Sequence, residues 1–205
     1  MLIVRQNEID RMMLEELASW EERLMAALPA RGYFEERIPQ VVAARLPEQW
    51  QQVAEGYAAL LDDPVQGVEA LRRVVFLVWY SWNEPWPLTG IRELSADVQR
   101  RVLERLDEQL ASGQPDAELR SMLRGYGPGL PFDQHPQLAA VNGFLASVQG
   151  PYSPDTPLGP LQARGALGAY WLSRNDLPNK PLERTGTDRR GEDDRGRAGR
   201  SAPIR

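Results

Sequence analysis

The sequence feature that most constrains the fold is the run of residues 74–80, in which every side chain is apolar or aromatic. A segment with no polar face must be covered on all sides, so the rest of the domain has to be built around it. The run is short enough to be a buried strand, and three of its residues are valines, which suit a sheet. The residues that lead into it keep helical spacing, however, and this favours a central buried helix: Val65, Val68, Leu71 and Val75.

Amphipathic spacing predicts two helices near the start of the chain. Apolar residues step by three or four over residues 9–28, with Asn7 as the N-cap and Pro29 at the end. A short second helix is expected over residues 39–46, because Pro39 can occupy the first helical position without losing a hydrogen bond.

The remaining elements are also predicted to be helices. One follows Pro47 and continues to residue 61, and Asp63 is placed to cap the central helix after it. Ser95 is expected to cap the next helix, which Gly113 ends. Shorter apolar patterns predict helices around residues 119–126, 138–148 and 161–172.

The predicted fold class is therefore all-α. One domain of about seven helices, packed around the central apolar helix, is expected to cover residues 1–177. Residues 178–205 are predicted to form a disordered tail, because only Leu182 and Ile204 are large and apolar among Arg, Gly, Asp and Glu. Truncation after Pro178 is expected to leave the melting temperature nearly unchanged.

Composition narrows the function classes. The chain has no cysteine and a single histidine, so disulfides, thiolate metal sites and histidine clusters are excluded, and no metal or cofactor is expected. The last 27 residues carry eight basic and five acidic side chains, a net charge of +3. Because the whole chain has a net charge of −5, the rest of the chain, here called the body, carries −8. An acidic body argues against nucleic acid as a partner.

The hydropathy pattern predicts a cytoplasmic protein that does not enter a membrane. The longest apolar run is far below the roughly 20 residues needed to span a bilayer. Residues 1–4 form too short an apolar start for a secretory signal and run into Arg5 and Glu8.

The central run ends in the block of residues 79–86, Trp-Tyr-Ser-Trp-Asn-Glu-Pro-Trp, which holds three of the six tryptophans. On a helix, Trp82 and Trp86 lie on a different face from the first tryptophan of the block. Glu84 precedes a proline, and a residue in that position is pushed out of the helical region, so the helix is expected to end near Asn83. The candidate binding residues are Trp82, Glu84 and Trp86, and no catalytic or metal-binding residue is assigned.

Two interpretations of this block remain open. A carboxylate desolvated among indoles would have a raised pKa, which suits acid–base chemistry or cation binding. Alternatively, the tryptophans pack the core, and Glu84 pairs with an arginine or caps the turn at residues 88–91. The solvent exposure of Trp82 and Trp86 distinguishes three outcomes. The two side chains can be fully buried, can line a concave pocket with Glu84, or can form an exposed flat patch.

Three other motifs are interpreted as structural. His135 follows Asp133, but no nucleophile accompanies the pair, so an exposed loop histidine is favoured. The segment Gly-Tyr-Gly-Pro-Gly at residues 125–129 lacks the preceding strand and the lysine of a phosphate-binding loop, so a turn is expected. The acidic pairs Glu15-Glu16, Glu21-Glu22 and Glu35-Glu36 lack the Glu-x-x-His of helical di-metal sites and are expected to lie on solvated faces.

Residues 3–28, with Ile3-Val4-Arg5-Gln6 and Trp20-Glu21-Glu22-Arg23, resemble the opening of small bacterial proteins found near type VI secretion genes. Residues 76–91, with Phe-Leu-Val-Trp-Tyr, Glu-Pro and Leu-Thr-Gly-Ile, resemble a motif of bacterial helical proteins of unknown activity. The tail from Lys180 resembles C-terminal extensions produced by read-through into a repeated genomic element. None of these resemblances implies an activity or a site residue.

Two functions follow as hypotheses. The first is a non-enzymatic interaction or accessory protein that contacts a protein partner through the aromatic block. The alternative is a small-molecule or enzymatic pocket lined by Trp79, Trp82, Glu84 and Trp86, with Glu84 as the acid–base group. The first is preferred because the chain carries no catalytic signature.

Overall fold

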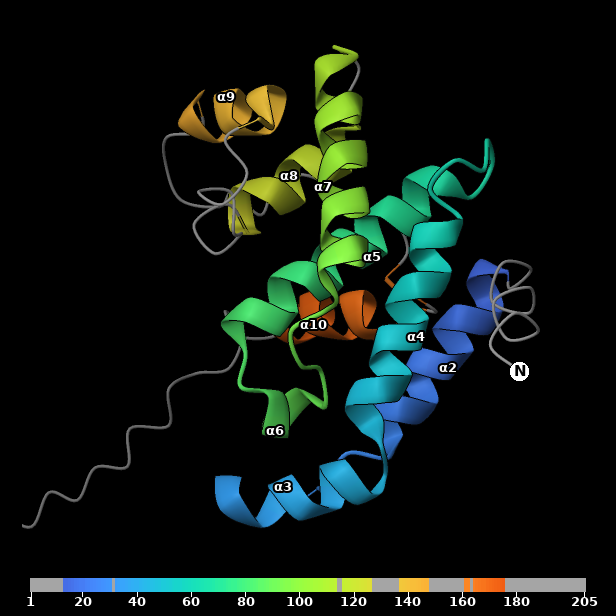
Figure 1. Cartoon of the computed structure of the whole chain (residues 1–205), viewed down its shortest axis with the longest axis vertical. Coiled ribbons are helices and arrows are strands. Elements are labelled where there is room, and N and C mark those ends of the chain that lie inside the picture. The colour runs from blue at the N-terminus through green and yellow to red at the C-terminus, as the bar shows by residue number, and fades with distance from the viewer. Residues whose placement is uncertain are drawn as a thin grey trace, which may run out of the picture.

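A computed structural model describes residues 13–30, 32–113, 116–126, 137–147, 161–162 and 164–175. Within this part of the chain the fold is all-α, as the sequence predicts, and contains no strand (Figure 1). The helices are α2 (Leu14–Ala26), α3 (Phe34–Ala43), α4 (Leu46–Ala59), α5 (Gly67–Asn83), α6 (Trp86–Thr89), α7 (Ala96–Ala111), α8 (Ala117–Tyr126), α9 (Ala139–Ser147) and α10 (Gly165–Asn175).

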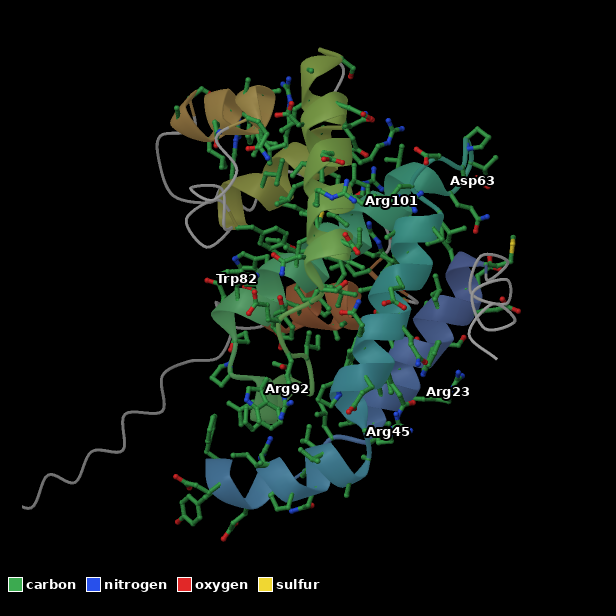
Figure 2. The ribbon with its side chains drawn as sticks, viewed as in Figure 1. Arg23, Arg45, Asp63, Trp82, Arg92 and Arg101 are labelled. Carbon is green, nitrogen blue, oxygen red and sulfur yellow. The ribbon has the colours of Figure 1, made fainter. Side chains whose placement is uncertain are left out.

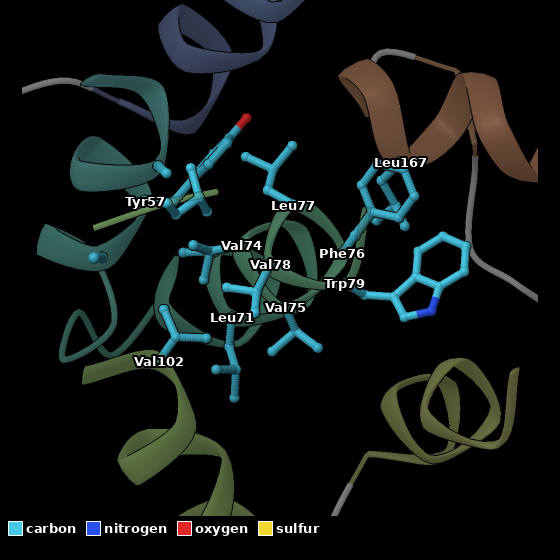
Figure 3. Close-up of a cluster of buried hydrophobic side chains, with 14 of the residues drawn as sticks. Tyr57, Leu71, Val74, Val75, Phe76, Leu77, Val78, Trp79, Val102 and Leu167 are labelled. Atoms are coloured by element: carbon cyan, nitrogen blue, oxygen red, sulfur yellow. The ribbon is translucent and has the colours of Figure 1, made fainter. Parts of the chain in front are cut away.

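Helix α5 is the centre of the fold. Seen along its axis, it sends apolar side chains in all directions, toward Tyr57 of α4, Val102 of α7 and Leu167 of α10 (Figure 3). The whole run of residues 74–80 is helical, so the strand alternative is wrong, and every residue from 73 to 79 is buried. A helix that is apolar all round is stable only when other helices enclose it, and here α4, α7, α8 and α10 do so.

The ends of α5 follow from local chemistry. Before the helix, Asp63 Oδ1 accepts hydrogen bonds from the amides of Val65 and Gln66, both at 2.8 Å, and this turn leads into Gly67. At the other end, the side-chain amide of Asn83 donates to the carbonyl of Trp79 at 2.8 Å. Glu84 then adopts an extended conformation (φ −113°, ψ 137°), which confirms the predicted end at Asn83.

Other predicted helices are confirmed as well. Ser95 Oγ accepts the amide of Val98 at 3.4 Å and caps α7, and Gly113 (φ +72°) follows its last turn. Helix α9 begins where Asp107 Oδ1 of α7 accepts the amide of Val141 at 2.9 Å, which fixes α9 against α7.

The prediction that Pro39 begins a helix is wrong. Helix α3 begins five residues earlier at Phe34, where the Glu36 carboxylate accepts the amide of Tyr33 at 2.9 Å and caps the first turn. Pro39 lies inside the helix on an exposed face, where it removes only one intrahelical hydrogen bond. Arg45 then adopts a left-handed conformation (φ 53°), and Pro47 is the second residue of α4 rather than an interruption before it.

Several predicted features lie outside the described residues: the Asn7 cap, His135, the glycines at 127 and 129, and the tail over residues 178–205. Among the helices that are described, none combines the length and the apolar character needed to cross a membrane.

Candidate binding surface and cleft

The first half of the aromatic block belongs to the core. Trp79 is buried and its ring lies parallel to that of Tyr126, with the centroids 4.6 Å apart. Phe76 and Tyr80, one turn apart on α5, stack at 4.9 Å, and Tyr170 of α10 packs edge-on against Trp79 at 5.3 Å. Phe76, Trp79 and Tyr80 share one face of α5, as residues three or four apart on a helix do, and this places Trp79 in the packing between α5, α8 and α10.

The second half of the block turns toward solvent. Trp82, at the C-terminal end of α5, has 39% of its surface exposed (Figure 2). Trp86, the first residue of α6, is partly buried, and the guanidinium of Arg92 lies 4.1 Å from the centre of its ring. That cation–π contact holds an arginine over an indole at the surface, and Leu88 of α6 is also exposed.

Glu84 joins these two aromatic elements. Its amide donates to the carbonyl of Tyr80 at 3.0 Å, but its carboxylate makes no hydrogen bond or ion pair with any residue that the structure describes. The arginine pairing considered for Glu84 is therefore not formed with Arg92, which stacks on Trp86 instead. We call the group of Trp82, Glu84, Trp86, Leu88 and Arg92 the aromatic surface.

A cleft of about 260 Å³ adjoins the aromatic surface, with which it shares Leu88, and lies between α2, α4, α5, α6 and α10. Trp82, Glu84 and Trp86 do not line it, and the block contributes only Tyr80. The lining is largely apolar and contains no charged side chain: Met25, Leu28, Trp50, Tyr80, Leu88, Thr89, Ile91, Ala166, Ala169, Tyr170 and Ser173. A second hollow of about 290 Å³, between α4 and α7, is lined mainly by charged residues of these two helices.

One wall of the cleft, α10, is held in place by buried charges that sequence reasoning missed. The guanidinium of Arg164, just before α10, donates to both carboxylate oxygens of Glu69 at 2.7 and 2.6 Å and also binds Glu118 of α8. Arg73 donates to Glu69 at 2.9 Å. Burial alone would raise the pKa of Glu69, but the hydrogen bonds from the two arginines outweigh it and hold that pKa below its usual value.

Glu21 of α2 completes this arrangement. It is 1% exposed, which contradicts the expected solvated face, and its Oε2 accepts the amide of Ala166 at 2.6 Å in the first turn of α10. Burial raises the pKa of Glu21 to about 7, against the opposing effects of the Ala166 amide, Arg73 and Tyr57. The sequence does contain a signal for this burial, since Glu21 lies four residues after Leu17 and three before Leu24, on the apolar stripe.

Comparison of this chain with models of known protein families, with curated proteins and with solved structures finds no match.

Proposed function

We propose that this chain is a non-enzymatic interaction protein and that a partner protein binds its aromatic surface. The observation that carries the proposal is the carboxylate of Glu84, which pairs with no described residue and stands in the sequence between Trp82, whose indole is exposed, and Trp86, on which Arg92 stacks. Tryptophan and arginine are the residue types that contribute most to binding in protein interfaces.

The arrangement favours a particular kind of partner. A carboxylate that lacks an intramolecular cation can form a charge-assisted hydrogen bond to an arginine or lysine of another chain. The neighbouring indoles and Leu88 offer apolar area to the residues beside that cation. The expected partner segment therefore carries a basic residue next to a large apolar one.

Selection of a random peptide display library against the full-length chain tests this proposal. The expected result is enrichment of peptides in which arginine or lysine lies beside an aromatic or large aliphatic residue. Titration of such a peptide should show affinity at least about tenfold weaker for Trp82→Ala and for Glu84→Gln, the range expected for a central interface residue.

Two substitutions serve as matched controls. Glu22→Gln removes an exposed carboxylate on α2, and Val65→Ala truncates a side chain that is 87% exposed before α5. Both should leave the affinity unchanged, and circular dichroism should show that all four variants are folded. Enrichment without basic residues, or equal binding by Glu84→Gln, would refute the proposal.

A further inference from the structure

The cleft and the aromatic surface are continuous with each other. Leu88 belongs to both, and its side chain is 42% exposed. Ala169 of α10, which also lines the cleft, is exposed as well. The cleft is therefore partly open, and a protein that covers the aromatic surface can reach into it. Sites for free small molecules enclose most of the ligand, whereas a side chain of a bound protein can enter through such an opening.

Glu84 links the aromatic surface to the cleft through its charge. Its amide donates to the carbonyl of Tyr80 at 3.0 Å, and Tyr80 lines the cleft. Burial, together with the charge of Glu84 and the neighbouring Tyr170, raises the pKa of Tyr80 above its usual value. The Glu84 carboxylate is therefore close enough to act on a group in the cleft wall. A cation that pairs with Glu84 would hold its neighbours in the partner segment near the cleft.

The cleft itself favours an uncharged, apolar group of limited size. Among the described residues no charged side chain lines it, so a charged group would lose its hydration without gaining a counter-ion. Met25, Leu28 and Ile91 supply apolar area. A cavity of about 150 Å³ holds benzene, so about 260 Å³ has room for one aromatic or large aliphatic side chain. An α-helix, about 10–12 Å across with its side chains, is too large, and the backbone of a bound segment must stay outside.

We infer that the cleft is the pocket in which the partner protein buries one large apolar side chain, while the basic residue next to it pairs with Glu84. This use of the cleft rests on the proposed function, and it adds where the apolar residue binds and how large it can be. The occupant is a side chain of a protein segment, because only a segment that carries a cation beside its apolar group uses both the cleft and Glu84.

Selection of the same random peptide library against full-length Ala169→Trp tests this use of the cleft. The new indole, placed at an exposed position of the lining, should fill the cleft, so large apolar residues should no longer be enriched beside the basic one. Ala111→Trp makes the same change at an exposed position of α7 and should enrich the same peptides as the wild type. The peptide most enriched by the wild type should bind Ala169→Trp at least about tenfold more weakly, the loss expected for one large apolar side chain.

A second measurement needs no substitution in the cleft. In wild-type protein labelled with ¹³C at its five methionine methyl groups, the most enriched peptide should shift the signal of Met25, which lines the cleft. This signal is identified as the one that is missing from Met25→Leu. A copy of the peptide with alanine in place of its large apolar residue should leave the Met25 signal in place at concentrations that saturate the wild-type chain.

Two results distinguish a failure of this inference from a failure of the proposed function. If Glu84→Gln and Trp82→Ala weaken peptide binding but the Met25 signal does not move, or Ala169→Trp enriches the same apolar residues, the partner binds the aromatic surface without entering the cleft. The inference is then wrong and the proposed function stands. If Ala169→Trp abolishes binding while Glu84→Gln and Trp82→Ala bind like the wild type, the aromatic surface is not the partner site, and the inferred pairing with Glu84 falls with it.

Discussion

Replacement of Glu21 by glutamine tests whether the buried carboxyl that contacts α10 destabilises the fold when it ionises. The amide is nearly the same size, and its oxygen can still accept the hydrogen bond from Ala166. Only the ionisation is lost. The wild-type pKa of about 7 lies above the ordinary value of 4.5, so the folded state binds more protons than the unfolded state between these two values. The stabilising contribution is therefore complete below about pH 4.5 and is lost as the pH rises through 7.

The magnitude follows from that displacement. A shift of this size corresponds to about 3 kcal/mol between the fully protonated and fully ionised limits, at about 1.4 kcal/mol per pH unit. Between pH 5 and pH 8 the wild type should lose about 2.5 kcal/mol of unfolding free energy through Glu21. Glu69, whose pKa is lowered, acts in the opposite sense and only in more acidic solution, so it does not mask the effect.

Urea unfolding at pH 5, 6, 7 and 8, followed by tryptophan fluorescence, measures the difference between Glu21→Gln and the wild type. All other titrating groups are common to both proteins, so their contributions cancel. The variant should gain about 2–3 kcal/mol relative to the wild type across this range. Glu15→Gln, on the same helix but exposed and not among the groups that act on Glu21, should run parallel to the wild type. If Glu21→Gln also runs parallel, the buried carboxyl does not titrate as argued.

Three further substitutions probe the fold by the same urea assay. Arg164→Met removes the hydrogen bonds that link Glu69 and Glu118 to the start of α10, while Arg72 and Arg73 still pair with these carboxylates, so it should cost about 2–3 kcal/mol. Arg100→Met on the exposed face of α7 should cost at most about 1 kcal/mol, and equal losses would contradict this. Gly165→Ala should cost about 2 kcal/mol or more, because it places a side chain on a residue with a left-handed backbone (φ +56°) and in contact with Glu21. Gly143→Ala, inside α9 with open space around it, should not destabilise the fold. Ser95→Ala removes the α7 cap and should cost about 1 kcal/mol; no change would show that the cap is redundant.

The sequence predicts those features of this fold that depend on a few neighbouring residues. The end of α5 is an example, because Pro85 constrains Glu84 whatever the rest of the protein does. The burial of residues 74–79 is another, since these residues are all apolar or aromatic and leave the segment without a polar face. Pro39 shows the limit of such rules: a proline preference for first turns did not prevail over the cap that Glu36 supplies to Tyr33.

Features assembled from distant segments could not be predicted in this way. The acceptor role of Glu21 depends on an amide 145 positions later, and Tyr57 and Arg73, which also act on that carboxyl, come from two other helices. The apolar stripe of α2 predicts that residue 21 faces the core, but a glutamate at this position predicts an exposed side chain. The cleft is a property of five elements together, and no single stretch of sequence carries its pattern.

Helix α10 follows the buried charge Arg164 and also lines the cleft. The effect of the charges on the position of α10 can therefore be tested apart from their effect on global stability. Arg164 does not line the cleft, yet it holds the helix that supplies Ala169 and Tyr170 to the lining. If the ion pairs are what keep α10 docked, Arg164→Met should speed amide hydrogen exchange in α10 more than in the other helices, because local opening of α10 then costs less free energy. Ser95→Ala destabilises the fold at the start of α7 and should leave the exchange of the α10 amides relative to the other helices unchanged. Wild-type exchange of the α10 amides in Arg164→Met would show that packing alone docks α10 and that the charges contribute only to global stability.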